Sequence, residues 1–147
     1  MIAQIKGKLV EKHPTHVIID CNGLGYMVHI SLHTFGQLGA DESIKLFTHL
    51  QVKEDSHTLF GFFQPIERTV FRLLISISGI GASIARTMLS SMSPQEIQHA
   101  ILSENLAAIK GVKGIGLKTA QRVLIELKDK VQKIEGNDEI PILQSNR

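Results

Sequence analysis

The sequence predicts two domains of different fold class, an all-β domain followed by an all-α domain. Three observations support this. Short segments rich in β-branched and aromatic residues, separated by turn residues, fill the first 63 of the 147 residues. After Pro65 the apolar residues recur at helical spacing instead. The second half also contains one glycine-rich pattern twice, which indicates a repeated structural unit.

The first domain, residues 1–64, is expected to hold five short strands. The pair on either side of Asn22-Gly23 is the clearest, because both residues tolerate the positive φ of a tight turn. Five antiparallel strands in this length suit a small closed barrel such as the five-stranded OB-fold, and an SH3-like barrel would show the same periodicity. A short helix or turn is expected at 31–38. The expected strands are 2–10, 16–20, 26–30, 43–52 and 58–63.

The second domain, residues 65–134, is expected to be helical. The clearest helix start is Ser93-Pro94, because serine is a good N-cap, proline suits the first helical position, and Glu96 completes a capping box. Residues 135–147 lack a helical period and are expected to form a flexible linker. The expected helices are 67–77, 84–92, 94–102, 106–109 and 117–133.

The formal net charge of +2 conceals a gradient along the chain. Residues 1–65 carry 5 Lys/Arg against 6 Asp/Glu, residues 66–134 carry 10 against 5, and residues 135–147 carry 1 against 3. A basic helical half indicates a polyanionic partner. The single cysteine, Cys21, excludes an internal disulfide, and no apolar run or leader pattern points to a membrane span or secretion.

The repeated pattern is Gly-Ile-Gly at 79–81 and again 35 residues later at 114–116, each between two expected helices. Glycine permits the positive φ of a tight helix–helix turn, and the central isoleucine can anchor the turn. The N–H groups that open the next helix are unpaired and face outward, where they can hold a backbone phosphate without reading a base. The candidate DNA-binding residues are Gly79, Ile80, Gly81 and Ser83 in the first hairpin, and Lys113, Gly114, Ile115, Gly116, Lys118, Thr119 and Arg122 in the second.

Other interpretations of these glycines are weaker. One Gly-Ile-Gly alone would be an ordinary tight turn, but two copies at matching positions in the basic half favour phosphate binding. A dinucleotide fingerprint needs a preceding strand and a third glycine, and a Walker A loop needs Gly-Lys-Ser/Thr. Neither motif is present, so we expect no nucleotide-hydrolysing motor, no cofactor and no catalytic residue.

A small barrel followed by VFRLLISISGIGASIARTMLS and VKGIGLKTAQRVLIELKDK resembles the RuvA family, whose members bind Holliday junctions through tandem helix-hairpin-helix motifs. The same resemblance is carried by four further segments: MIAQIKGKLVEK, NGLGYMVHI, FTHLQVKEDSHTLFGF and ERTVF. In all, it covers residues 1–134. It implies a cytoplasmic, nucleoid-associated bacterial protein of recombination, DNA repair and the SOS response. Such a protein is a non-enzymatic homotetramer, in some cases an octamer, that holds a four-way junction open and square-planar for the RuvB ATPase and the RuvC resolvase.

The resemblance also assigns Glu54 and Asp55 to an acidic pin, a loop that repels phosphates at the junction centre. A solvated turn is the ordinary alternative for such a pair, and a metal-dependent nuclease is disfavoured because no further ligands cluster nearby. Ser83 occupies a position of the first hairpin that is often basic in the family, so that hairpin is expected to bind more weakly. Leu117 replaces an often-basic residue in the second hairpin, and both departures lower the expected electrostatic share of the affinity. The chain ends at Arg147 inside the expected linker. We therefore expect a third domain, which would contact RuvB, to be missing, and RuvB not to be stimulated normally.

The remaining candidates are weak. His13 with His16, and His29 with His33, have spacings that suit a metal, but no set of four ligands accompanies them, so no metal site is expected. Two functional alternatives stay open. One is a generic helix-hairpin-helix module that binds duplex DNA without preferring junctions. The other is a nuclease or glycosylase, which is poorly supported because Asp129 has no evident partner.

Overall fold

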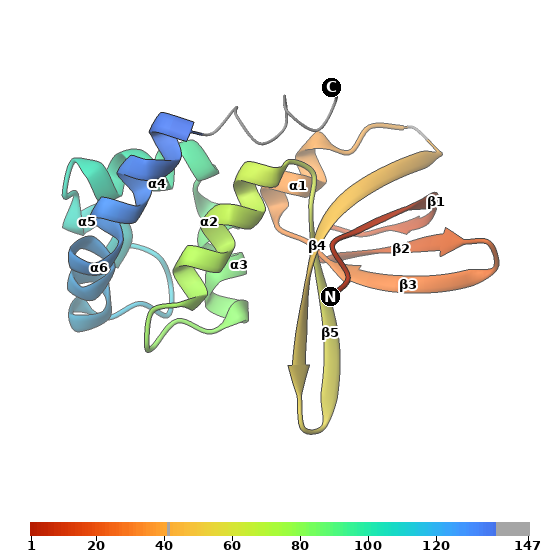
Figure 1. Cartoon of the computed structure of the whole chain (residues 1–147), viewed down its shortest axis with the longest axis horizontal. Helices are drawn as coiled ribbons and strands as arrows, with labels where there is room; N and C mark the ends of the chain where they lie inside the picture. The colour runs from red at the N-terminus through yellow and green to blue at the C-terminus, as the bar shows by residue number, and fades with distance from the viewer. Residues whose placement is uncertain (41, 138–147) are drawn as a thin grey trace.

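The first domain is a closed barrel with strand order β1-β2-β3-β5-β4 (Figure 1). A computed structural model describes residues 1–40 and 42–137 of the chain. All strand pairs are antiparallel except β3 with β5, which run parallel. A short helix, α1 (Leu32–Gln37), lies between β3 and β4 in the chain, which confirms the OB-fold. The strands are β1 (Gln4–Lys12), β2 (His16–Cys21), β3 (Leu24–His29), β4 (Ser43–Lys53) and β5 (Ser56–Phe62).

Alternating burial explains why these segments form the barrel. Val17 and Ile19 of β2 are fully buried and share one core with Val28 of β3 and Leu46 of β4, while Ile18 between them is only half-buried. The turn at Asn22-Gly23 has the expected positive φ angles of 54° and 94°. The expected strands are therefore confirmed, with ends shifted by up to two residues.

Five helices form the second domain: α2 (Pro65–Ile75), α3 (Ala82–Ser91), α4 (Pro94–Leu102), α5 (Leu106–Lys110) and α6 (Leu117–Asn137). The capping box at Ser93 and Glu96 is present with both of its hydrogen bonds. Helix α6 is longer than expected, so the first three residues of the expected linker are helical. Residues 135–137 contain no proline, and Gly136 costs a helix only about 1 kcal/mol relative to alanine. The rest of that linker, 138–147, lies outside the described residues.

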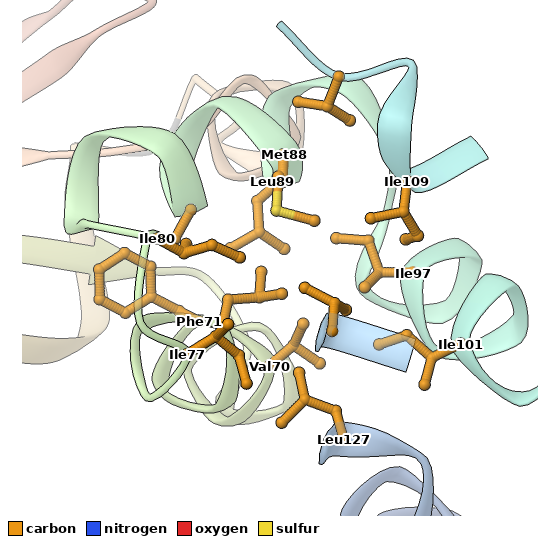
Figure 2. Close-up of a cluster of buried hydrophobic side chains, with 14 of the residues drawn as sticks. Val70, Phe71, Ile77, Ile80, Met88, Leu89, Ile97, Ile101, Ile109 and Leu127 are labelled. Atoms are coloured by element: carbon orange, nitrogen blue, oxygen red, sulfur yellow. The ribbon is translucent and has the colours of Figure 1, made fainter. Parts of the chain in front are cut away.

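The helical core extends onto strand β5 of the barrel. Phe71 of α2 is fully buried, and its ring centroid lies 5.2 Å from that of Phe60 and 5.0 Å from that of Phe62, both on β5. Figure 2 shows Ile80, Met88 and Leu89 pointing into the same cluster. The barrel and the helices are thus packed as one body. Within the described part of the chain, no helix is both long enough and apolar enough to span a membrane.

Candidate nucleic-acid interface

Both Gly-Ile-Gly segments form the expected turns between two helices. The first hairpin joins α2 to α3 through residues 76–81, and the second joins α5 to α6 through residues 111–116. Gly79 has a φ of 101° and Gly114 a φ of 96°, a conformation that residues with a Cβ rarely adopt. The glycines are therefore required by the backbone at these two positions.

The isoleucine of each turn is an anchor. The Ile80 N–H donates to the Ile77 carbonyl at 3.0 Å, and the Ile115 N–H donates to the Val112 carbonyl at 3.2 Å. Both isoleucine side chains are buried, at 4% and 7% exposure. The same hydrogen bond and the same burial recur 35 residues apart, so the repeat in the sequence is a repeat in three dimensions.

Each turn opens the following helix with a glycine. Gly81 is the N-cap of α3 in extended conformation and offers no side-chain cap, and Gly116 precedes α6. The Ala85 and Ala120 N–H groups donate to the carbonyls of Gly81 and Gly116, each at 3.0 Å, where the helical ladder begins. The N–H groups before them have no intrahelical partner and lie at the positive end of the helix dipole. Each hairpin therefore presents a cradle suited to a phosphate.

The two hairpins pack against each other with approximate twofold symmetry. A Cβ placed on Gly79 would lie 3.1 Å from Thr119 Oγ1, and one placed on Gly114 would lie 3.7 Å from Ile84 Cγ1. Thr119 and Ile84 are themselves 35 residues apart, at matching positions of the two hairpins. This contact holds the two cradles side by side. Thr119, expected at the DNA surface, is half-buried in it.

The exposed cations belong to the second hairpin. Lys113 and Lys118 are exposed, as is Lys110, while the matching part of the first hairpin presents the exposed Ser83. Arg122 lies one turn beyond Lys118 and is also exposed, but its Nη1 donates to the Ser78 carbonyl at 3.3 Å, and its Nε lies 3.5 Å from Glu126 Oε2. Arg122 therefore connects the second hairpin to the turn of the first.

Glu54 and Asp55 form the two-residue turn that joins β4 to β5. The strand pairing runs to Lys53 and Ser56, and both carboxylates are exposed, with no ion pair to any cation in residues 1–40 and 42–137. Figure 1 shows this two-stranded ribbon projecting beyond the rest of the barrel, toward the same side as the turns of the two helical hairpins. The acidic tip and the phosphate cradles thus belong to one face.

The barrel and the first hairpin are connected by a buried carboxylate that the sequence did not reveal. Glu67 of α2 is fully buried and accepts hydrogen bonds from Ser31 Oγ and, at 2.5 Å, from Thr34 Oγ1. Burial raises the pKa of Glu67, and the two hydroxyl donors oppose that rise. In the sequence, Glu67 resembles any acidic residue in the first turn of a helix, so nothing local predicts its burial.

Two arginine–histidine pairs complete this connection. Arg72 Nε donates to His49 Nδ1 at 3.1 Å, and Arg86 Nη1 lies 3.3 Å from His29 Nδ1. Burial, followed by the neighbouring arginine charges, lowers the pKa of both histidines, which keeps them neutral and able to accept these bonds. The helices that carry the first hairpin are therefore oriented by the barrel.

The other histidines and the cysteine do not form a site. The rings of His13 and His16 stack with centroids 4.6 Å apart, and the Cys21 thiol donates to the Lys6 carbonyl at 3.3 Å. Over the described ranges, no three His, Cys, Asp or Glu side chains are grouped so as to hold a metal ion.

Comparisons with known proteins agree with this architecture. Residues 1–61 match the model of the RuvA N-terminal domain, and residues 71–129 match the SAM-like helix-hairpin-helix tandem. The "Holliday junction branch migration complex subunit RuvA" of Christiangramia forsetii is 59% identical over 99% of this chain and 76% of its own length. The protein of the same name from Flavobacterium psychrophilum is 60% identical over the same shares, and that of Laribacter hongkongensis is 42% identical over 94% of this chain and 69% of its own length. The chain therefore belongs to the RuvA family.

Proposed function

We propose that this protein binds four-way DNA junctions without reading their sequence and holds them open for branch migration. The observation that carries the proposal is the presence of two side-by-side phosphate cradles and an exposed acidic tip on one face of the molecule. The relatives are named as subunits of a Holliday junction branch migration complex, which supports the same role here.

Each hairpin grips the sugar-phosphate backbone of a duplex arm. The N–H groups after Gly81 and Gly116 donate to phosphate oxygens at the positive ends of α3 and α6. Lys113 and Lys118 add charge at the second hairpin, whereas Ser83 adds only a hydroxyl at the first. Such contacts position the protein on DNA and carry no base specificity, so binding falls steeply with salt.

The acidic tip acts by repulsion. In a fourfold assembly, each subunit places Glu54 and Asp55 at the junction centre, so the carboxylates of all four subunits gather there and their negative charges add up. They repel phosphates there and favour separated strands in an open, square-planar junction. The pin therefore needs symmetry to act.

The assembly and the partners belong to the same proposal. The protein acts as a homotetramer, two of which can enclose one junction as an octamer, in the bacterial cytoplasm at the nucleoid. It performs no catalysis itself: the RuvB ATPase supplies the motor and the RuvC resolvase the later cleavage, in recombination and DNA repair.

A gel-shift comparison of a four-way junction with a linear duplex of equal total length tests the junction preference. We expect the junction to bind at least tenfold more tightly at moderate salt, because its four arms occupy the hairpins of several subunits at once. Native mass spectrometry of the same samples should show a tetramer. Equal affinity for the two DNAs would support a generic duplex-binding module instead, and a monomer would leave the pin without its symmetry.

A further inference from the structure

The outer face of the barrel carries a cluster of lysines that the hairpins do not use. Lys6 of β1 lies directly opposite Lys45 of β4, and Lys8 lies two residues further along β1, opposite Ser43. All three lysines are exposed. Like charges directly opposite each other in a sheet are destabilising, so this pair costs the barrel stability.

Among the described residues, one carboxylate faces this cluster in the sheet: Asp20 of β2 lies opposite Lys8, while Lys6 and Lys45 lie opposite each other. The ion pairs found there involve His13, Arg122 and Lys128, and none reaches the lysines of this face. The Lys45 ammonium lies 5.0 Å from the centroid of the Phe47 ring, which leaves its charge unneutralised.

The positive charge continues from the barrel onto α2. The Arg68 guanidinium lies 5.5 Å from the same Phe47 ring, and Arg72 follows one turn later. Burial, and then the nearby charge of Arg72, lower the pKa of Arg68. Four residues after Arg72, the turn of the first hairpin begins at Ser76. We call the set Lys6, Lys8, Lys45, Arg68 and Arg72 the basic stripe.

From this arrangement we infer that the basic stripe is a second contact for the sugar-phosphate backbone of DNA. One end of the stripe, at Arg72, lies close to the first hairpin, which has no lysine in its turn. The other end lies far from the pin along the barrel, because Lys45 is near the start of β4 and the pin follows the end of β4. An acidic protein surface fits less well, because lysine is depleted from protein interfaces and three of the five residues are lysines. The inference rests on the proposed DNA binding and deepens it.

The test is the salt dependence of binding to a fluorescently labelled linear duplex by the full chain. Each lost phosphate contact lowers the slope of log affinity against log salt by about 0.9, so the double variant K6Q/K45Q should lose about 2 from the slope. Between 50 and 200 mM salt, its affinity should then fall roughly 10- to 20-fold less than that of the parent protein. The matched control, K128Q/K130Q, removes two charges from α6 away from the stripe and should keep the parental slope.

Several outcomes separate this inference from the proposed function. An unchanged slope in K6Q/K45Q, with a slope lowered by K118Q, would overturn the stripe and leave the hairpins as the binding site. A lowered slope in a protein that does not prefer junctions would support the stripe and contradict the junction proposal. Dissociation of the assembly by K6Q/K45Q in native mass spectrometry would instead make this face a subunit contact and overturn the inference. Because a like-charge pair is removed, thermal unfolding should show no loss of stability.

Discussion

The two helical hairpins have nearly the same backbone conformation but differ in what they pack against and in the charge they expose. Their glycines have φ angles of 101° and 96°, and their isoleucines are buried alike. The first hairpin joins helices that are tied to the barrel and has no lysine in its turn. The second joins helices that pack on α2 and α4, and it presents Lys113 and Lys118 to solvent.

The same backbone motif is therefore used in two ways within one chain. The hydrogen bonds of Glu67, Arg72 and Arg86 orient the first hairpin relative to the pin. None of these three residues belongs to the second hairpin, and the exposed lysines of that hairpin can contact phosphates. We infer that the first hairpin fixes geometry and the second supplies most of the electrostatic attraction.

Both hairpins share a buried isoleucine at the centre of the turn, Ile80 in the first and Ile115 in the second. Ile80→Ala and Ile115→Ala each remove a buried anchor and should lower the free energy of unfolding by about 3 kcal/mol, as is typical for a large-to-small change in a core. Urea unfolding followed by circular dichroism measures both. Costs that agree within about 1 kcal/mol would confirm that the two turns are equivalent as structures, whereas a cost below about 1 kcal/mol at either site would contradict it.

The positive-φ glycines of the two turns, Gly79 and Gly114, differ in how much space surrounds them. Gly79→Ala and Gly114→Ala both force a residue with a Cβ into a positive φ, which costs on the order of 1 to 2 kcal/mol. Gly79→Ala should cost about 1 kcal/mol more, because its Cβ would meet Thr119 Oγ1 at 3.1 Å, while Ile84 leaves 3.7 Å at Gly114.

Urea midpoints of the two glycine variants provide the comparison. Gly36→Ala serves as the control, since a Cβ there meets no atom within 4 Å and its φ is not positive. An equal loss of unfolding free energy at Gly79 and Gly114 would mean that Thr119 moves aside freely. The contact between the hairpins would then place no constraint on either glycine.

The sequence could predict the parts of this molecule that depend on neighbours in the chain. The turn at Asn22-Gly23, the capping box at Ser93 and both Gly-Ile-Gly turns follow from local preferences for φ and for capping. The parts that depend on packing could not be predicted. The contact of Thr119 with Gly79 joins residues 40 positions apart, and only the folded arrangement brings them together.

The candidate site shows the same division. Spacing alone marked Lys118 and Arg122 as one face of a helix, but it could not show that Arg122 donates to the Ser78 carbonyl. Glu67 was missed for a related reason: its burial depends on α1, whose Ser31 and Thr34 precede it by more than 30 residues.

The charge difference between the hairpins can be reversed experimentally. Lys118→Gln should lower the salt slope of duplex binding by about 0.9, and Ser83→Lys should raise it by a similar amount. In free energy this amounts to roughly 1 kcal/mol at moderate salt, or about a fivefold change in affinity. Fluorescence anisotropy over a salt series gives both slopes. If Ser83→Lys leaves the slope unchanged, the first hairpin does not reach a phosphate, and its role is structural only.

The smallest expected effect tests the connection between the first hairpin and the barrel through pH. Because the pKa of Glu67 is raised in the folded state, the folded protein holds this proton more tightly than the unfolded chain does. Stability from this group is therefore fully present below the ordinary glutamate pKa and is lost as pH rises through the raised value, by at most about 1.4 kcal/mol per pH unit. Glu67→Gln, which stays neutral, should remove this decline. Urea unfolding of both proteins between pH 4 and pH 8 yields a difference curve in which the other titrating groups cancel. A flat difference curve would show that Glu67 carries the same charge in the folded and unfolded states, and it would contradict the raised pKa.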